Sequence, residues 1–187
     1  MLLFSRIFHE LPAQECVQPR LGWVIFPHNA GPRPLGRTES LPEAALSMFT
    51  PRATQIFACE AIAIPEAVMN DAEALAGRDI TWFIDNEPAC SSFIRGCSKC
   101  EDVSEVVAIG LLQLQKLNCR VWFEWIDSEA NPSDGLSREG LQDRWTQEQD
   151  WHLEEVLWEY PKQERCGSLK DWRWQVVKTL GGAGNYA

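Results

Sequence analysis

Short apolar runs divide the first part of the chain into segments of strand length. Residues 1–8, 21–26 and 80–85 are dominated by aliphatic and aromatic side chains, and turn-forming residues separate them. Runs of this length are typical of β-strands. The segment at 119–127 alternates apolar and polar positions, so it predicts a further strand. Trp122 and Trp125 fall on opposite faces of that strand, and we expect at least one of them to lie in the core.

Helical spacing appears between these runs. From Thr54 to about Leu75 apolar residues recur three and four positions apart, which predicts a helix with one buried face. Pro65 is expected to kink or restart this helix. A brief helix is predicted after Pro88 and a longer one at residues 100–118. The proline-rich stretch at 27–52 is interpreted as irregular, with one short helix.

The segment "SEANPSDGLSREGL" (128–141) predicts the last helix of the core. Asn131 suits the N-cap and Pro132 the first helical position, which puts Asp134 in the first turn. Strands that alternate with long helices indicate an α/β fold with a partly parallel sheet.

A change of composition near residue 141 suggests two parts, a core at 1–141 and a tail at 142–187. Five of the nine tryptophans lie in the tail, at positions 145, 151, 158, 172 and 174. Its apolar residues at 153, 156, 157 and 160 fit a helical stripe, so we expect one or two helices and a flexible end.

Composition excludes some classes of function and location. A net charge of −10 argues against strong, indiscriminate binding to nucleic-acid backbones. No apolar run is long enough to span a bilayer, and "MLLFSR" is too short for a signal peptide, so an intracellular location, cytoplasmic or nuclear, is expected. The odd count of seven cysteines suits reduced thiols. Cys97 and Cys100 have zinc-knuckle spacing but lack a second ligand pair, so no zinc site is expected.

Three carboxylates occupy positions where a carboxylate is costly or close to a ligand site. Glu60 has apolar neighbours three and four residues away on both sides, so it projects from the buried face of its helix. Asp85 follows a buried strand, at the edge where open α/β sheets bind ligands. Asp134 lies in a first helical turn. Each has an ordinary alternative: a rotated helix face for Glu60, an Asx-turn for Asp85, and a favourable helix dipole for Asp134.

Together these residues resemble a known family. Glu60 in "TQIFACEAIAI", Asp85 in "FIDNEPA" and Asp134 in "SEANPSDGLSR" are similar to the ribonuclease H domains of retroelement reverse transcriptases. The resemblance runs from about Met1 to Leu141. It implies a mixed sheet of about five strands flanked by helices, here with the helical tail added.

The resemblance also implies an activity. Family members hydrolyse the RNA strand of RNA–DNA hybrids with two Mg²⁺ ions, and Mn²⁺ is a possible substitute. Hard oxygen ligands suit Mg²⁺, and two ions can activate the attacking water and stabilise the leaving oxygen. By resemblance Glu60, Asp85 and Asp134 are the catalytic residues and metal ligands. The implied partners are an RNA–DNA hybrid or other nucleic acid and an upstream polymerase domain; no membrane is expected.

One position departs from the family pattern. The first Asp of the family lies on the first strand, where this chain has Arg6. A fixed positive charge there would oppose a metal ion and pair with Asp85. Glu10 or Glu15 could replace the missing acid only if the strand shifted its register. The family's His before the Asn-Pro segment is also replaced, by Glu129-Ala130.

The sequence leaves three functions open. The first is a retroelement-derived ribonuclease H-type endonuclease with an incomplete carboxylate set. The second is a catalytically silent domain of the same fold that binds protein or nucleic acid, with the tryptophan-rich tail as a protein-binding element. The third is a transposase or integrase core, which normally ends its acid set with Glu, whereas the late acid here is Asp134.

Overall fold

The computed structural model describes residues 1–8, 19–28, 31–52, 55–158, 168–173 and 176, and for residues 6–8 it describes the backbone alone. The strands are β1 (Leu2–Phe8), β2 (Arg20–Phe26), β3 (Leu35–Ser40), β4 (Asp79–Ile84), β5 (Arg120–Trp125) and β6 (His152–Val156). The helices are α1 (Glu43–Leu46), α2 (Ile56–Asn70), α3 (Ala72–Leu75), α4 (Glu87–Arg95), α5 (Glu101–Lys116), α6 (Asp134–Arg138) and α7 (Arg144–Gln147). Two short 3₁₀ turns, η1 (Ser128–Ala130) and η2 (Gly140–Gln142), flank α6.

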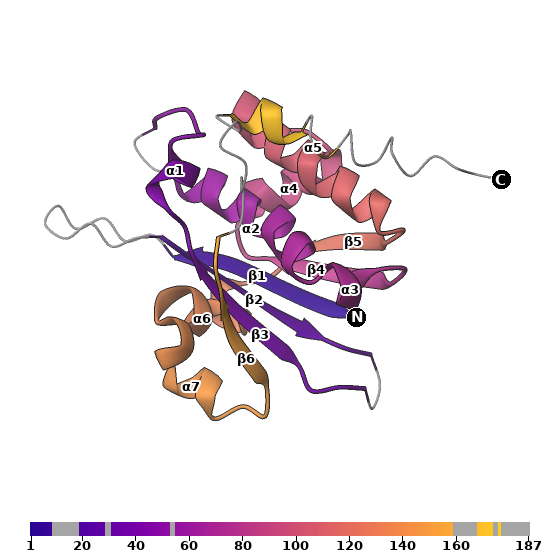
Figure 1. Cartoon of the computed structure of the whole chain (residues 1–187), viewed down its shortest axis with the longest axis vertical. Helices are drawn as coiled ribbons and strands as arrows, with labels where there is room; N and C mark the ends of the chain where they lie inside the picture. The colour runs from indigo at the N-terminus through magenta and orange to yellow at the C-terminus, as the bar shows by residue number, and fades with distance from the viewer. Residues whose placement is uncertain (9–18, 29–30, 53–54, 159–167, 174–175, 177–187) are drawn as a thin grey trace, which may run out of the picture.

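The strands form one mixed sheet in the order β5-β4-β1-β2-β3-β6. β1 and β2 pair antiparallel, as do β2 and β3, whereas β4 is parallel to both β1 and β5. Helices α2, α4 and α5 lie on one side of the sheet, and α6 and α7 lie on the other (Figure 1). The predicted α/β class with a partly parallel sheet and flanking helices is confirmed.

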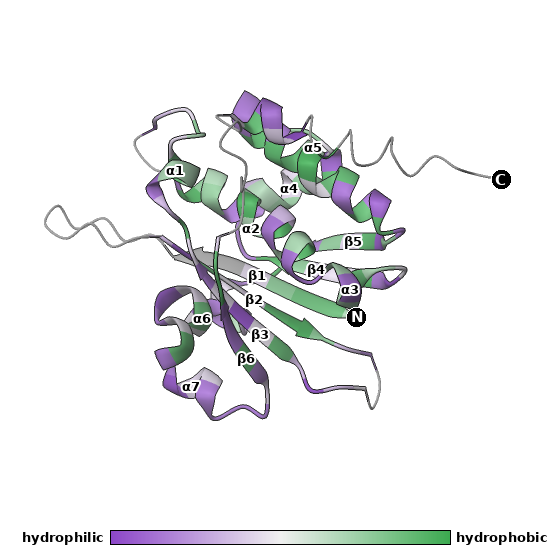
Figure 2. Cartoon of the chain, viewed as in Figure 1, coloured by the Kyte–Doolittle hydropathy of each residue, from purple (hydrophilic) through white to green (hydrophobic). Residues whose placement is uncertain are grey.

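The main core lies between the sheet and the helices α2, α4 and α5. Trp23 and Trp82 are fully buried there, with aliphatic residues of α2 and α5 packed around them. Figure 2 shows hydrophobic residues along β1, β2 and α2, and mainly hydrophilic residues on α7. Burial of this apolar surface is the main favourable term for folding.

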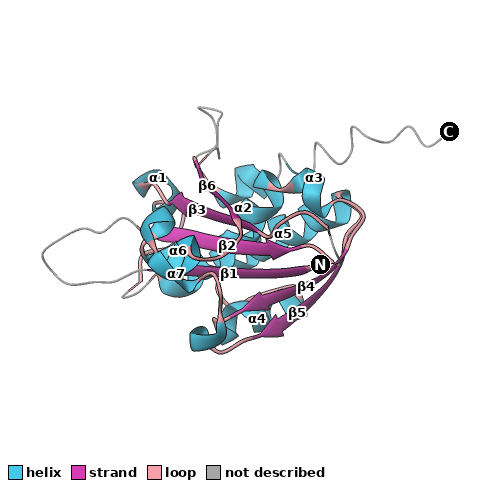
Figure 3. Ribbon diagram, turned by 90° about the horizontal axis from the view of Figure 1, so that it is seen from below, coloured by secondary structure: helices cyan, strands magenta, loops and turns pink. Residues whose placement is uncertain are grey.

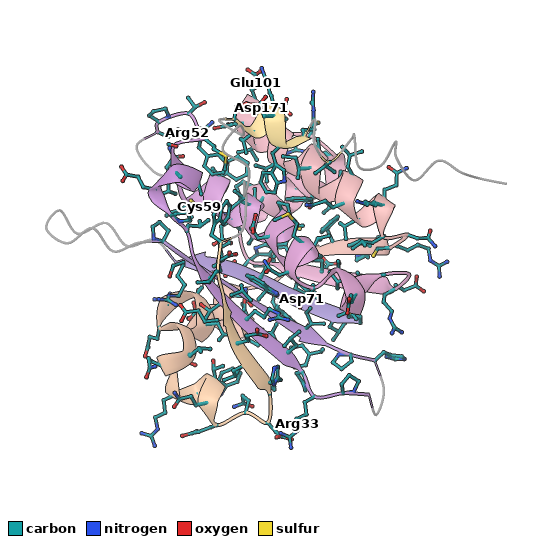
Figure 4. The ribbon with its side chains drawn as sticks, viewed as in Figure 1. Arg33, Arg52, Cys59, Asp71, Glu101 and Asp171 are labelled. Carbon is teal, nitrogen blue, oxygen red and sulfur yellow. The ribbon has the colours of Figure 1, made fainter. Side chains whose placement is uncertain are left out.

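A buried acid joins the helix layer to the sheet. Asp71, directly after α2, accepts hydrogen bonds of 2.7 Å from the Trp23 indole and the Arg37 guanidinium. Burial raises the pKa of the Asp71 carboxyl, and the two donors offset part of that rise. Arg37 also pairs with Glu154 of β6, so this network connects α2, the central strands and the edge strand. Asp71 and Cys59 are labelled toward opposite ends of α2 in Figure 4.

Two features of the core differ from the sequence-based predictions. The stretch at 27–52 contains a full strand, β3, whose polar residues concealed it. Thr38 is buried, and its hydroxyl lies within hydrogen-bonding distance of the carbonyl oxygens of Leu21 at 3.2 Å and Leu136 at 2.8 Å. These contacts offset the cost of burying the hydroxyl. Pro65 does not restart the helix, since α2 continues through it.

The tail differs more. Residues 153 and 156 of the predicted helical stripe lie in β6, which pairs parallel with β3 from Leu35↔His152 to Glu39↔Val156; residue 160 of that stripe lies outside the described residues. Over five residues, spacing cannot separate a helix from a strand, and the free edge of β3 decides the outcome. The helical prediction is confirmed at residues 169–173, where Leu169 and Trp172 are buried against the core. The predicted flexible end at 177–187 lies outside the described residues.

Neither tryptophan of β5 is in the core. Trp122 is 68% exposed and Trp125 is 49% exposed, so the expectation that at least one would be buried is wrong. β5 is an edge strand, so its side chains have a neighbouring strand on one side only.

No helix within the described ranges combines the length and apolar character that crossing a bilayer requires.

Candidate functional site

The three predicted acids lie on or directly after three elements that each contact β1. Asp85 directly follows β4, whose last residue, Ile84, pairs with Ser5 of β1 in the parallel register. Glu60 is in the first half of α2, which packs on β1 and β2 from one side of the sheet. Asp134 opens α6, which packs on β1, β2 and β3 from the other side.

Glu60 is buried, as the apolar spacing around it predicted. It is 4% exposed. Its neighbour Cys59 is also buried, and this burial together with the Glu60 charge raises the pKa of the Cys59 thiol to about 12. Cys59 lies near the side of the molecule toward which β1 runs (Figure 4). A carboxylate buried in this way needs compensation from partners, a proton or a cation.

Asp85 is only partly exposed, and both of its carboxylate oxygens are shielded from solvent. The Trp125 indole donates a hydrogen bond of 3.2 Å to the Asp85 carbonyl oxygen, which fixes the backbone at the end of β4. Asn86 caps α4, because its side-chain oxygen accepts from the Ala89 N–H at 3.0 Å. A strand that ends in Asp-Asn therefore uses the amide to start the next helix and leaves the acid at the sheet edge.

Asn131 positions the segment before Asp134, although it is not the N-cap that the sequence predicted. Asn131 is 4% exposed, and its Nδ2 donates to the Ser5 carbonyl oxygen at 3.1 Å. Its Oδ1 accepts from the Ser133 N–H at 3.1 Å and from the Ser133 hydroxyl at 2.7 Å. The N-cap position belongs to Ser133, so the prediction for Asn131 is wrong in detail. Its actual role is more informative, since it fastens the segment before Asp134 to the first strand.

Gly22 allows α6 to approach the sheet closely. A Cβ atom at Gly22 would lie 2.6 Å from the Ser137 nitrogen and 2.9 Å from the Ser133 carbonyl oxygen. Gly22 pairs with Arg6 in the β1–β2 register, so this contact lies at the same end of the sheet. Sequence reasoning missed this function, although a glycine inside a strand pattern is a known signal of close backbone approach.

The Asp134 carboxylate is paired with its own helix. Its Oδ1 accepts from Arg138 Nε at 2.8 Å, in a half-exposed i,i+4 ion pair. Such a pair contributes little to stability, and a cation could replace the guanidinium.

The position of Arg6 follows from the strand register. β1 pairs Ser5 with Ile84, so Arg6 and Asp85 are the next residues along the two parallel strands. Ser5 is buried, and its hydroxyl accepts from the Trp82 indole at 3.1 Å. The register therefore sets the backbone of Arg6, where the resemblance leads us to expect an Asp, beside the backbone of Asp85.

The oxygen ligands are of the kind that Mg²⁺ prefers, but they do not form a complete centre. Across the described residues, no three His, Cys, Asp or Glu side chains lie close enough together to hold a metal ion. A two-ion centre therefore does not fit the arrangement of the described side chains. The roles of Glu60, Asp85 and Asp134 as metal ligands stay a prediction.

Comparison with known proteins supports the fold. No protein-family model matches the sequence, and no curated protein matches it either. Among solved structures, the ribonuclease H1 of the halophilic archaeon Halobacterium salinarum NRC-1 aligns with a TM-score of 0.54 at 17% identity. The alignment covers 76% of this chain and 97% of that chain. The chain has a ribonuclease H-like fold, to which β6 adds a sixth strand.

Proposed function

We propose that this chain is a ribonuclease H-type endonuclease domain of a retroelement, directed at the RNA strand of RNA–DNA hybrids. The observation that carries the proposal is the seating of α6. Asn131 ties the segment before Asp134 to Ser5 of β1, whose partner on β4 is the residue before Asp85, and Gly22 lets α6 pack closely on β2, within a ribonuclease H-like fold. Glu60 lies on α2, which also contacts β1. The proposal takes Glu60, Asp85 and Asp134 as the acid set that two-metal phosphodiester hydrolysis would use.

Arg6 limits the activity that we expect from the chain as it stands. The backbone of Arg6 follows the Ser5–Ile84 pair, next to Asp85, and an arginine carries a permanent charge that would oppose a cation bound by that acid. We therefore propose weak cation binding, at most at one site, and slow turnover. An upstream polymerase domain in the intact element would supply part of the hybrid-binding surface, which a chain with a net charge of −10 lacks.

A cleavage assay tests this proposal. The substrate is an RNA–DNA hybrid with labelled RNA, with single-stranded RNA and double-stranded DNA as competitors, in Mg²⁺ or Mn²⁺. Arg6→Asp should increase hybrid-specific cleavage of the RNA strand at least about tenfold, equivalent to about 1.4 kcal/mol in the barrier. Adding Asp85→Asn to Arg6→Asp should abolish that gain.

The matched control is Asp79→Asn. Asp79 is at the other end of β4 and forms an exposed ion pair with Arg120. Asp79→Asn in the Arg6→Asp background should leave cleavage unchanged. If the folded Arg6→Asp chain cleaves nothing, or if it cleaves single-stranded RNA equally well, the endonuclease proposal fails.

A second function, a catalytically silent domain of the same fold, is favoured by one specific observation. Asp134 is paired with Arg138, and the described side chains contain no group that would hold a metal ion. On this alternative, Arg6→Asp gains neither Mg²⁺ binding nor cleavage, while the chain still binds its partner.

A further inference from the structure

Among the described residues, helix α6 covers only part of its side of the sheet, over β1, β2 and β3. Residues that pair across neighbouring strands point to the same face, so Phe26, Leu2, Thr81 and Trp122 form one row across β2, β1, β4 and β5. Phe4 and Phe83 belong to the next row. α6 packs on β1, β2 and β3, and Figure 3 shows α6 and α7 over β1 and β2, with β4 and β5 to one side.

Aromatic rings form a continuous chain along this face. Phe83 stacks on Phe4 with ring centres 4.7 Å apart, and Phe4 meets Phe26 edge to face at 5.6 Å. Phe26 contacts Trp151 at 5.5 Å, and Trp151 contacts Trp145 of α7 at 5.5 Å. Edge-to-face and offset contacts of this kind are favourable and hold the rings in fixed positions. We call Leu2, Phe4, Phe26, Phe83, Trp122 and Trp145 the aromatic face.

The aromatic face is partly open to solvent. Leu2 is 44% exposed and Trp145 is 50% exposed, and Trp122 extends it onto the edge strand. A cavity of about 700 Å³ opens between the sheet and α6, with Leu2, Phe4 and Phe26 from the strands and Trp145 from α7 in its wall. Open aromatic surface next to a cavity is a common feature of binding sites.

The charges around the cavity are mainly negative. Its lining includes four carboxylates, from Glu129, Asp134, Glu139 and Asp143. Arg138 is the one cation among the described residues that line it, and it is paired with Asp134. Glu124, exposed on β5, adds another acid to the same face as Phe83.

We propose that the aromatic face binds a basic amphipathic segment of a partner protein, with apolar anchors on the rings and Lys or Arg side chains toward the acidic rim. Cations interact favourably with aromatic rings and with carboxylates, and such complementarity sets partner choice and association rate. A single-stranded nucleic acid could also stack on exposed rings, but it needs cations to follow its backbone, and this rim would repel phosphates. The cavity shares Asp134 with the proposed nuclease site, but none of the six residues of the aromatic face is a proposed metal ligand.

The test uses the full chain and two model peptides of equal length with the same leucine and tryptophan positions. One peptide has lysine and the other has glutamate at all remaining positions. Fluorescence anisotropy should show binding of the lysine peptide, with affinity at least about tenfold higher than that of the glutamate peptide, and a weaker affinity at high salt.

Variants locate the site. Trp122→Ser and Trp145→Ser remove exposed rings of the aromatic face, and each should weaken lysine-peptide binding several-fold, roughly threefold or more. The control is Trp125→Ser, on the same strand as Trp122 but pointing to the other face. Glu129→Gln with Glu139→Gln should reduce the salt dependence, because both carboxylates are exposed on the rim. Circular dichroism confirms that each variant is folded.

Four results would overturn this proposal. The first two are no binding of either peptide and equal binding of both. The third is that Trp125→Ser weakens lysine-peptide binding as much as Trp122→Ser does. The fourth is that oligouridine displaces the lysine peptide, and does so equally well from the chain with Glu129→Gln and Glu139→Gln. The last result would assign the aromatic face to single-stranded nucleic acid instead.

Discussion

Gly22→Ala tests whether close packing of α6 positions Asp134. The added methyl group would lie 2.6 Å from the Ser137 nitrogen, 2.9 Å from the Ser133 carbonyl oxygen and 3.0 Å from the Leu136 carbonyl carbon. All three are backbone atoms, so no side-chain rotation relieves the clash. Either α6 or β2 must move by roughly 1 Å to restore ordinary contact distances.

The expected cost follows from two opposing effects. Overpacking of a well-packed site costs about 1–3 kcal/mol, and the lower backbone entropy of unfolded alanine returns about 0.4–1 kcal/mol. We expect a net loss of about 1–2 kcal/mol in the free energy of unfolding. For a chain of this size, that loss lowers Tm by about 2–8 °C. Thermal and urea unfolding followed by circular dichroism measure it.

The matched control is Gly31→Ala, because the nearest atom to a Cβ there is Pro27 Cβ at 3.5 Å, an ordinary contact. It should be neutral or slightly stabilising. In the Arg6→Asp background, Gly22→Ala should also weaken Mg²⁺ binding, because it displaces the helix that begins at Asp134. If Gly22→Ala and Gly31→Ala unfold at the same temperature, the close-packing argument is refuted.

Three further predictions concern buried polar groups. Asn131→Ala leaves buried backbone and hydroxyl groups without partners, so it should cost about 1–3 kcal/mol in urea unfolding; a neutral effect would contradict the role of this residue in seating α6. Burial alone would raise the pKa of the Asp102 carboxyl, but hydrogen bonds from Arg52 and two backbone N–H groups outweigh it and hold that pKa below its usual value. The stability from Asp102 is therefore present at neutral pH and is lost as pH falls through the lowered pKa, so the difference in unfolding free energy between wild type and Asp102→Asn should shrink below about pH 4; a pH-independent difference would oppose this. At pH 8 iodoacetamide should label exposed Cys97 in the native protein and Cys59 only after unfolding, as peptide mass mapping would show; early labelling of Cys59 would mean that its environment is open.

The sequence predicted those elements whose pattern depends on local spacing. The long amphipathic α5 and the apolar runs of β1, β2 and β4 were identified because their periods are clear. Burial of Glu60 followed from the apolar residues one helical turn away on both sides. These features depend on neighbours that the chain itself supplies within a few residues.

Features that depend on distant partners were missed. β3 is stabilised by pairing with β2 and by hydrogen bonds from Thr38, and β6 by pairing with β3, so neither is evident from its own residues. The contact of Gly22 with α6 joins positions more than a hundred residues apart, and so does the bond from Asn131 to Ser5. Tertiary context decides such short segments.

The most direct test of the central claim is a calorimetric titration of Mg²⁺ into the wild-type chain, into Arg6→Asp and into Arg6→Asp with Asp85→Asn. The claim is that Glu60, Asp85 and Asp134 contribute to a cation site that Arg6 opposes. We predict weak or single-ion binding by the wild-type chain, affinity at least about tenfold higher for Arg6→Asp, and loss of that gain with Asp85→Asn. If Arg6→Asp changes nothing and Asp85→Asn leaves any binding intact, these acids are not a metal site.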